Sequence, residues 1–170
     1  MNTREYRKKL SRARDVAVQL LLDYSMKKRT VGGRRGIPAI MFDIDDTLVN
    51  YIGEPLGDII KVYKVAKALG FKIIVITARS ETYTNQTRRE LDSIGIEPDF
   101  LYLRAKDDRY SDFKLTKKTY LKDFYDIDIV LSMGDQWIDV NGKNSGTGIK
   151  LPSVQDNNLY VIKRQTAVRV

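Results

Sequence analysis

The sequence contains no cysteine and no histidine. Without cysteine the chain cannot form a disulfide, which fits a reducing compartment. Without histidine it cannot use a Ser-His-Asp or Cys-His catalytic arrangement, and most zinc sites are excluded as well. Any metal ion would have to be held by oxygen atoms, and oxygen ligands favour magnesium, manganese or calcium.

Long apolar runs are missing too. The longest apolar stretch near the N-terminus, residues 16–22, is interrupted by Gln19 and followed by Asp23, so it is too short to span a bilayer. Charged residues crowd this stretch, and no cleavage site of the A-x-A type follows it, which argues against a secretory signal. We therefore expect a cytoplasmic protein that makes no contact with membranes.

Charge is distributed unevenly along the 170 residues, whose length and composition predict one globular domain. Residues 1–36 contain 11 Lys/Arg and three Asp/Glu, whereas residues 37–170 contain 19 of each. The net charge of +8 therefore lies in the N-terminal segment. We divide the chain into a basic N-terminal helix with a Gly-rich linker, residues 1–36, and a core, residues 37–170.

The N-terminal segment predicts an amphipathic helix over residues 3–28, because apolar residues recur at spacings of three and four. Gly32, Gly33 and Gly36 then interrupt the pattern and predict a linker. One face of the helix is basic, and it could be a solvated surface, a contact for nucleic acid or another polyanion, an attractor of anionic substrates, or a homo-oligomer interface. The basic residues are Arg4, Arg7, Lys8, Arg12 and Arg14.

From residue 37 onward, strand and helix patterns alternate, which predicts an α/β fold with a mostly parallel sheet. Two further short strands are expected near the C-terminus. The predicted strands are 38–44, 72–77, 99–103, 127–133, 147–151 and 159–163, and the predicted helices are 56–69, 81–94 and 113–124.

Oxygen-bearing residues recur where the predicted strands end. Asp43 and Asp45 close the first strand, Thr77 closes the second, and Asp135 and Asp139 follow a later one. Because the carboxyl ends of parallel strands lie on one edge of the sheet, we expect these residues to form one site.

The spacing of Asp43 and Asp45 fits a nucleophile paired with a general acid/base, since alternate residues of a strand share a face. Carboxylates placed this close repel one another, and a hard divalent cation would offset the repulsion. The structural alternative is an ordinary strand that ends in an acidic turn.

These motifs resemble the haloacid dehalogenase (HAD) superfamily of phosphotransferases. The D-x-D-x-T pattern at Asp43, Asp45 and Thr47 carries the resemblance, which covers residues 38–163. Within the superfamily the sequence is most similar to the class B and plant-type, vegetative storage protein-like acid phosphatases. Four segments carry that similarity: residues 77–81 (T-A-R-S-E, where the family has T-G-R-S-E), Leu103-Arg104 with Asp107-Asp108, residues 134–139 (G-D-Q-W-I-D), and residues 149–152 (I-K-L-P).

The resemblance implies a Rossmann-like three-layer sandwich around a mostly parallel sheet. Superfamily members often insert a cap domain between motifs. Here 29 residues separate Thr47 from Thr77 and 36 separate Thr77 from Lys114, and the core's own elements occupy both intervals. No large cap domain is therefore expected, and the site should be open.

The resemblance also implies the chemistry: Mg²⁺-dependent hydrolysis of a phosphate monoester through an aspartyl-phosphate. Asp43 would be the nucleophile, which plant storage proteins of this group have lost, and Asp45 the general acid/base. Magnesium would contact the side chains of Asp43, Asp135 and Asp139, the last directly or through water, and a backbone carbonyl at Asp45.

Several other residues receive roles from the same resemblance. Thr77 would donate a hydrogen bond to phosphate, and Lys114 would stabilise transition-state charge, with Lys117 as the second candidate. Thr47 is a further substrate-binding candidate, and Arg79 and Arg104 would either touch phosphate or brace loops. The expected substrate is a nucleotide or another small monoester. The alternatives are a polynucleotide end held by the basic helix, and a non-catalytic phosphate-binding protein on the same fold.

Overall fold

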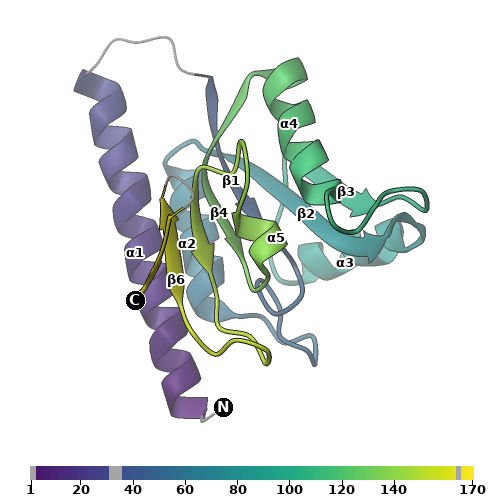
Figure 1. Cartoon of the computed structure of the whole chain (residues 1–170), viewed down its shortest axis with the longest axis horizontal. Coiled ribbons are helices and arrows are strands. Elements are labelled where there is room, and N and C mark those ends of the chain that lie inside the picture. The colour runs from purple at the N-terminus through teal and green to yellow at the C-terminus, as the bar shows by residue number, and fades with distance from the viewer. Residues whose placement is uncertain (1–2, 31–35, 164–165) are drawn as a thin grey trace.

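The structure, a computed structural model, describes residues 3–30, 36–163 and 166–170. Gly32 and Gly33 of the predicted linker lie outside the described residues. Four helices longer than one turn alternate with a series of strands (Figure 1). The helices are α1 (Thr3–Thr30), α2 (Gly57–Ala68), α3 (Thr84–Ser93), α4 (Phe113–Tyr125) and the short α5 (Trp137–Val140). The strands are β1 (Ile37–Phe42), β2 (Lys72–Ser80), β3 (Phe100–Arg104), β4 (Ile127–Gly134), β5 (Thr147–Lys150), β6 (Tyr160–Lys163) and β7 (Thr166–Arg169).

The strands form one sheet in the order β3-β2-β1-β4-β5-β6-β7. The five strands from β3 to β5 are parallel, and β6 and β7 extend the sheet as an antiparallel edge. After β1 the chain continues to β2 and β3 on one side of it, and then crosses to β4 on the other side. The carboxyl ends of β1 and β4 therefore lie next to each other at the point where the strand order reverses. Ligands of open α/β sheets bind in this place.

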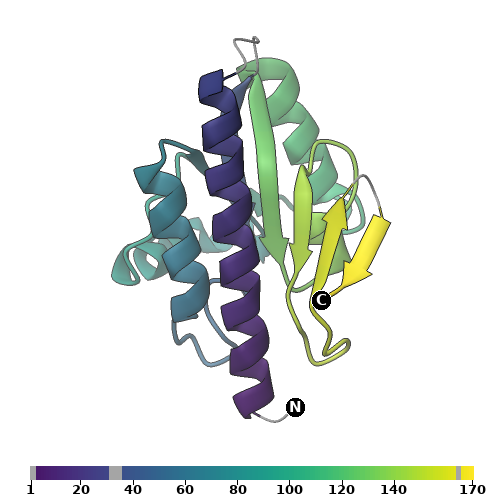
Figure 2. The same cartoon turned by 90° about the vertical axis from the view of Figure 1, so that its left-hand side faces the viewer.

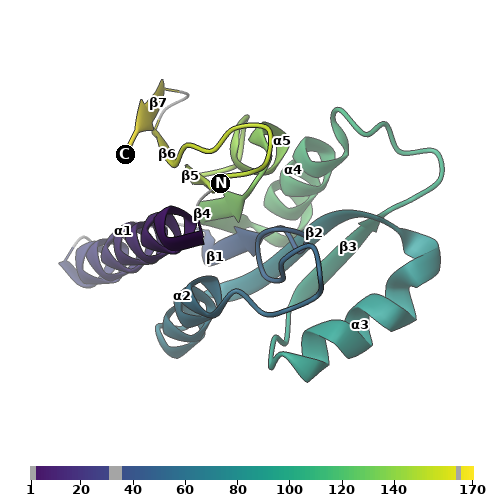
Figure 3. The same cartoon turned by 90° about the horizontal axis from the view of Figure 1, so that it is seen from below.

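Helices cover both faces of the sheet and make three layers (Figures 2 and 3). Helices α1, α2 and α3 lie on one face, and α4 with the short α5 lies on the other. Strand β1 alternates between the two layers: Ile40 and Phe42 belong to the core under α1 and α2, whereas Ala39 and Met41 belong to the core under α4. This alternation is the two-residue period of a strand that is buried on both faces.

The predicted N-terminal helix is confirmed and belongs to the same core. Its apolar stripe, Leu10, Ala13, Ala17 and Leu21, is buried against α2 and the sheet. Helix α1 runs antiparallel to β1, so its first turns lie beside the carboxyl edge of the sheet (Figure 2). The division of the chain at residue 36 stays a prediction. No helix among the described residues is long and apolar enough to cross a membrane.

The sequence missed two elements. Strand β7 was not predicted, because its four residues are all exposed and carry no alternating pattern. Helix α5 was not predicted, because four residues are too short to show a helical period. The predicted helix 81–94 also begins with a separate 3-10 turn, Glu81–Tyr83, before α3.

Candidate active site

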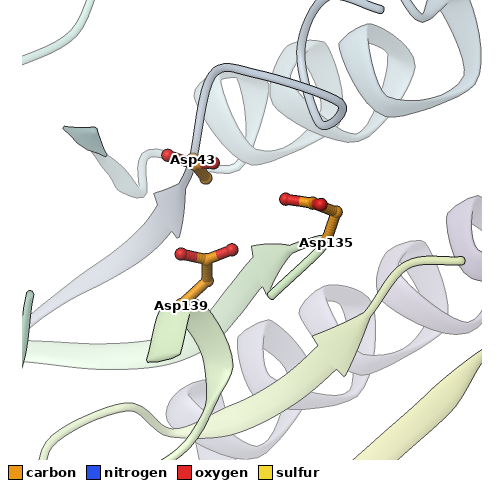
Figure 4. Close-up of side chains that lie close together, drawn as sticks. All are labelled: Asp43, Asp135 and Asp139. Atoms are coloured by element: carbon orange, nitrogen blue, oxygen red, sulfur yellow. The ribbon is translucent and has the colours of Figure 1, made fainter. Parts of the chain in front are cut away.

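Three carboxylates meet at the carboxyl ends of β1 and β4. Asp43 directly follows β1, Asp135 directly follows β4, and Asp139 lies on α5. One oxygen from each carboxylate lies within 4.8 Å of the others, and all three residues are buried (Figure 4). The Asp43 backbone N–H donates to the Met133 carbonyl at 3.0 Å and so ties the two strand ends together. The expectation that Asp43, Asp135 and Asp139 lie close together is therefore met.

The turn from β4 into α5 places Asp139 in this cluster. A Cβ atom on Gly134 would lie 2.2 Å from the Cβ of Asp139, so only glycine permits this approach. The Gln136 backbone N–H donates to Asp139 Oδ2 at 2.9 Å. The Gly134 position and this first-turn hydrogen bond leave the other oxygen of Asp139 facing the cluster.

Lys114 is the cation of the cluster. Its Nζ donates to Asp43 Oδ1 at 2.7 Å and to Asp139 Oδ1 at 2.5 Å, and its side chain is only 3% exposed. The second candidate, Lys117, is half-buried on another side of α4, where its Nζ lies 5.7 Å from the ring centres of Tyr102 and Phe113. The structure thus brings Lys114, and not Lys117, to the carboxylates.

Burial sets the electrostatics of this cluster. It raises the pKa of Asp43 to about 7, with Asp139 adding to the rise and Lys114 opposing it. It also raises the pKa of Asp135 to about 6, with a further contribution from Asp139. The pKa of Lys114 is raised, because its two carboxylate partners outweigh its burial. Burial together with repulsion between the carboxylates therefore outweighs the effect of Lys114 on Asp43.

Asp45 lies outside the buried cluster, and its side chain is 58% exposed. Arg79 holds it with two nitrogens: Nη2 donates to Asp45 Oδ1 at 2.6 Å and Nε donates to Oδ2 at 2.9 Å. The same guanidinium also donates to Glu90 of α3. These contacts show Arg79 bracing the loop after β1 through carboxylates, which is one of the two roles expected for it.

The two predicted threonines are buried near the strand ends. Thr77 is 1% exposed, and its hydroxyl oxygen accepts a hydrogen bond from the Arg79 backbone N–H at 3.2 Å. The hydroxyl of Thr47 is also buried and has no hydrogen-bond partner among the described residues. A buried hydroxyl without a partner is costly and calls for a structural reason or a ligand.

Arg104 is tied to its own loop rather than to the carboxylate cluster. Its Nη1 donates to the Asp108 carbonyl at 3.3 Å, and Asp108 Oδ2 accepts from the Ala105 backbone N–H at 2.9 Å. The L-R-x-x-D-D pattern therefore closes the turn after β3. A contact of Arg104 with phosphate stays a prediction.

Sequence reasoning missed a second buried lysine in the site. Lys118 is fully buried and donates to the Asp139 carbonyl at 2.5 Å and to Ser145 Oγ at 2.9 Å. Burial lowers its pKa to about 7. Its position four residues after Lys114 was the available signal, because residues at this spacing share a helix face. Lys118 holds the backbone of Asp139 through this hydrogen bond and thereby helps to position the Asp139 carboxylate in the cluster.

Comparison with known proteins shows which family the chain resembles. A family model described as HAD superfamily, subfamily IIIB (acid phosphatase), matches residues 51–162. Asp43, Asp45 and Thr47 precede this range. The chain is 30% identical over 125 residues to acid phosphatase 1 of Solanum lycopersicum, which covers 71% of this chain and 47% of that protein. The chain thus spans about half the length of this curated relative.

Solved structures share the fold. A class C acid phosphatase from Bacillus anthracis with tungstate bound has a TM-score of 0.66 at 18% identity and covers 84% of this chain and 68% of that one. A chain of the Pnkp1/Rnl/Hen1 complex has a TM-score of 0.54 at 23% identity and covers 62% of this chain and 42% of that one. At these identities the likeness concerns the fold alone.

Proposed function

The chain belongs to the HAD superfamily, subfamily IIIB, a family of acid phosphatases, and on this premise we propose that it hydrolyses phosphate monoesters. The observation that carries the proposal is the buried cluster of Asp43, Asp135 and Asp139 around the Lys114 ammonium at the carboxyl edge of the sheet. Burying three carboxylates is unfavourable for folding, so their retention is explained by what they bind and react with.

The first step transfers the phosphoryl group to Asp43. A carboxylate oxygen of Asp43 attacks phosphorus, the bond between phosphorus and the ester oxygen breaks, and Asp45 donates a proton to the leaving alcohol. In the second step Asp45 takes a proton from water, the water oxygen attacks phosphorus, and the bond between phosphorus and the Asp43 oxygen breaks, which releases inorganic phosphate and the Asp43 carboxylate. Both groups end in their starting protonation states.

The neighbouring residues position these two carboxylates and bind the phosphate. Lys114 holds Asp43 and supplies positive charge where transition-state charge develops. Arg79 holds Asp45 on the solvent-exposed side, where a leaving alcohol and a water molecule can reach it. The hydroxyls of Thr47 and Thr77 are the proposed hydrogen-bond donors to phosphate oxygens, and the lack of a protein partner for Thr47 supports its share of this role.

The donor set fits a divalent cation. Among the described residues only Lys114 forms an ion pair with the three buried carboxylates, so a bound cation would add the positive charge that they lack, and the donors that they offer are oxygens. We propose that Asp43, Asp135 and Asp139, with the backbone carbonyl of Asp45, hold Mg²⁺. When bound, the cation would offset the repulsion between the Asp43 carboxylate and an anionic phosphate.

A nucleotide or another small monoester is the proposed substrate. No large cap domain is present among the described residues, so the open site would admit larger substrates as well. The second candidate is a phosphorylated polynucleotide end. Its support is that the basic residues Arg4, Arg7 and Lys8 line a surface cavity at the first turns of α1, and that one structural neighbour comes from an RNA repair complex. Steep loss of affinity with salt would mark this candidate. A cytoplasmic location and a homo-oligomer stay predictions of the sequence.

Phosphate release tests the proposal. We expect Mg²⁺-dependent turnover of nitrophenyl phosphate by the wild type, none by Asp43→Asn, and unchanged turnover by Asp123→Asn, which alters an exposed carboxylate of α4. With the same ester, Asp45→Asn should accumulate a phosphoenzyme after acid quenching, because a good leaving group needs no proton in the first step whereas the second step needs a base. Binding of phosphate or Mg²⁺ without any turnover would instead indicate the non-catalytic alternative.

A further inference from the structure

A cavity of about 780 Å³ opens at the carboxyl edge of the sheet. Three segments line it: the first turns of α1, residues between 46 and 61 in the connection from β1 to α2 and the first turns of α2, and residues 152–154 after β5. In the view from below, the N-terminal end of α1 and the connection after β1 lie at this same end of the molecule (Figure 3). Helix α1 therefore forms one wall of a cavity that the core alone would leave open.

The cavity adjoins the carboxylate cluster. Asp46 lines it and directly follows Asp45 in the chain. Tyr6 of α1 also lines it, and its pKa is raised first by burial and then by the charges of Asp46 and Asp135. The lining of the cavity thus reaches the loop after β1, one residue beyond Asp45 and three beyond Asp43.

The rim of the cavity is apolar and unusually exposed. Tyr51 is 88% exposed, Ile52 60% and Val154 99%. Folding alone does not explain three large apolar side chains in water at one place. Tyr51 and Ile52 are held in position by a tight turn, in which Asn50 Oδ1 accepts hydrogen bonds from the Ile52 N–H at 3.0 Å and the Glu54 N–H at 2.9 Å. The turn therefore fixes the backbone that carries Tyr51 and Ile52 at the rim.

The α1 wall of the cavity carries one cation, Arg7, and the cavity is also lined by Lys61 and by the carboxylates Asp46, Glu54 and Asp58. Arg7 lines this cavity and the adjacent basic cavity with Arg4 and Lys8. No hydrogen bond or ion pair holds the Arg7 side chain within the part of the chain that the structure describes. By contrast, Asp58 of α2 is paired with Arg14, whose Nη1 lies 2.5 Å from its Oδ1. Arg7 is therefore available to an anionic ligand group.

We propose that this cavity binds the organic part of the phosphate monoester, and that it selects an alcohol with a flat apolar ring beside a second anionic group. The ring would rest against Tyr51 and Tyr6, and the second anion would contact Arg7. This inference rests on the proposed phosphatase function and extends it to substrate choice. It assigns α1 a direct part in specificity. The second anion could be another phosphate on a small molecule or the next phosphate of a nucleic acid strand.

Three esters separate the contributions: glycerol phosphate has no ring, adenosine 5′-monophosphate has the ring, and adenosine 3′,5′-bisphosphate has the ring and a second anion. Tyr51→Ala should lower kcat/KM for both adenosine esters about tenfold, within the range of ring stacking on aromatic side chains, and leave glycerol phosphate unchanged. Phe124→Ala, which removes a 74% exposed aromatic ring remote from the cavity lining, is the matched control and should change none of them.

Arg7→Gln should lower kcat/KM about fivefold or more for the bisphosphate alone, mainly through KM, as expected for one charge-assisted contact. Arg12→Gln removes the same charge from an exposed site on α1 outside both cavities and should have no effect. An oligonucleotide with a terminal phosphate, compared with the bisphosphate, shows which source of second anion Arg7 favours. Equal effects of Arg7→Gln and Arg12→Gln, or of Tyr51→Ala on all three esters, would overturn the proposal.

Failure of the proposed function would look different. If the wild type hydrolyses glycerol phosphate and neither Tyr51→Ala nor Arg7→Gln changes the ester preference, only the inference about the cavity is wrong. If the wild type hydrolyses no ester, binding of adenosine 3′,5′-bisphosphate is measured by calorimetry. Binding that weakens in Tyr51→Ala and Arg7→Gln but not in the two controls would then support the cavity alone, and no binding would overturn it.

Discussion

Two cations in the candidate site each join two carboxylates, but their surroundings differ. Lys114 joins Asp43 and Asp139, and the three side chains are 3%, 9% and 1% exposed. Arg79 joins Asp45 and Glu90, and these side chains are 21%, 58% and 26% exposed. The first group belongs to the buried cluster and connects the end of β1 to α4 and α5. The second, the exposed bridge, connects the loop after β1 to β2 and α3.

The difference separates two requirements of the proposed reaction. A nucleophile must be held still and kept away from competing water, and burial with a fixed ammonium achieves both. A group that exchanges protons with an alcohol and then with water must be reachable, and a partly solvated arginine pair allows this. Removing one partner from a buried pair leaves an uncompensated charge, whereas a solvated pair contributes little to stability. Mutation of the first group should therefore cost much more stability than mutation of the second.

The largest effect is expected from Lys114→Met. Asp43 and Asp139 would stay buried without their cation, which should destabilise the metal-free protein by about 3–5 kcal/mol. The same change removes transition-state charge stabilisation, so kcat should fall about 100-fold or more. Urea unfolding in the presence of a chelator and steady-state kinetics with Mg²⁺ measure the two effects separately.

Two further lysines of α4 make this test specific. Lys122→Met removes an exposed lysine paired with Asp126 at 3.0 Å and should change neither stability nor activity appreciably. Lys117→Met tests the second candidate for the catalytic lysine, and we expect a much smaller loss of kcat than in Lys114→Met. A larger loss in Lys117→Met would assign the catalytic role to Lys117 and contradict the reading of the buried cluster.

The contrast between the two groups also shows what a sequence can predict. Periodicity predicted the alternating strands and helices of a mostly parallel sheet, because β1 and its neighbours carry strong apolar runs, but it did not predict the order of the strands. The strand-end rule predicted that Asp43 and Asp135 meet, because parallel register fixes that geometry. It did not predict that Arg79 would join Asp45 to Glu90, because contacts between long side chains on separate elements leave no periodic signal.

Other parts of the site were hidden for similar reasons. The burial of Lys118 depends on the distance between α4 and α5, which no local pattern encodes. The wall formed by Tyr6 and Arg7 depends on how far α1 extends past the edge of the sheet. The sequence placed these residues on opposite faces of a helix, one apolar and one basic, and only the packing of α1 brings both to the cavity.

A smaller but measurable effect should come from Mg²⁺ and its dependence on pH. Burial raises the pKa of Asp43 to about 7 and that of Asp135 to about 6, above the ordinary value of 3.8. The folded protein then binds more protons than the unfolded one between these values, so these two groups make the metal-free protein less stable as pH rises from about 4 to about 7. A cation competes with those protons.

Stabilisation by Mg²⁺ should therefore be larger at pH 8 than at pH 5, reaching about 2.7 kcal/mol at a concentration 100 times the dissociation constant. The difference between unfolding with Mg²⁺ and unfolding with chelator, taken at each pH, cancels the contributions of exposed carboxylates. Asp135→Asn should reduce the stabilisation at pH 8, whereas Asp123→Asn should not. A stabilisation that is equal at both pH values would argue that the cation binds elsewhere.

The smallest effect on stability is expected from the exposed bridge. Arg79→Gln should change the free energy of unfolding by less than about 1 kcal/mol, as is typical of solvated ion pairs. If Arg79 positions Asp45 as the proton donor, kcat should fall about tenfold for an alkyl phosphate, whose leaving group needs a proton, and less for nitrophenyl phosphate. Glu90→Gln should give a weaker version of the same pattern. An equal fall for both esters, carried by KM, would instead mean that Arg79 touches the phosphate, and the exposed bridge would then be a resting arrangement that substrate displaces.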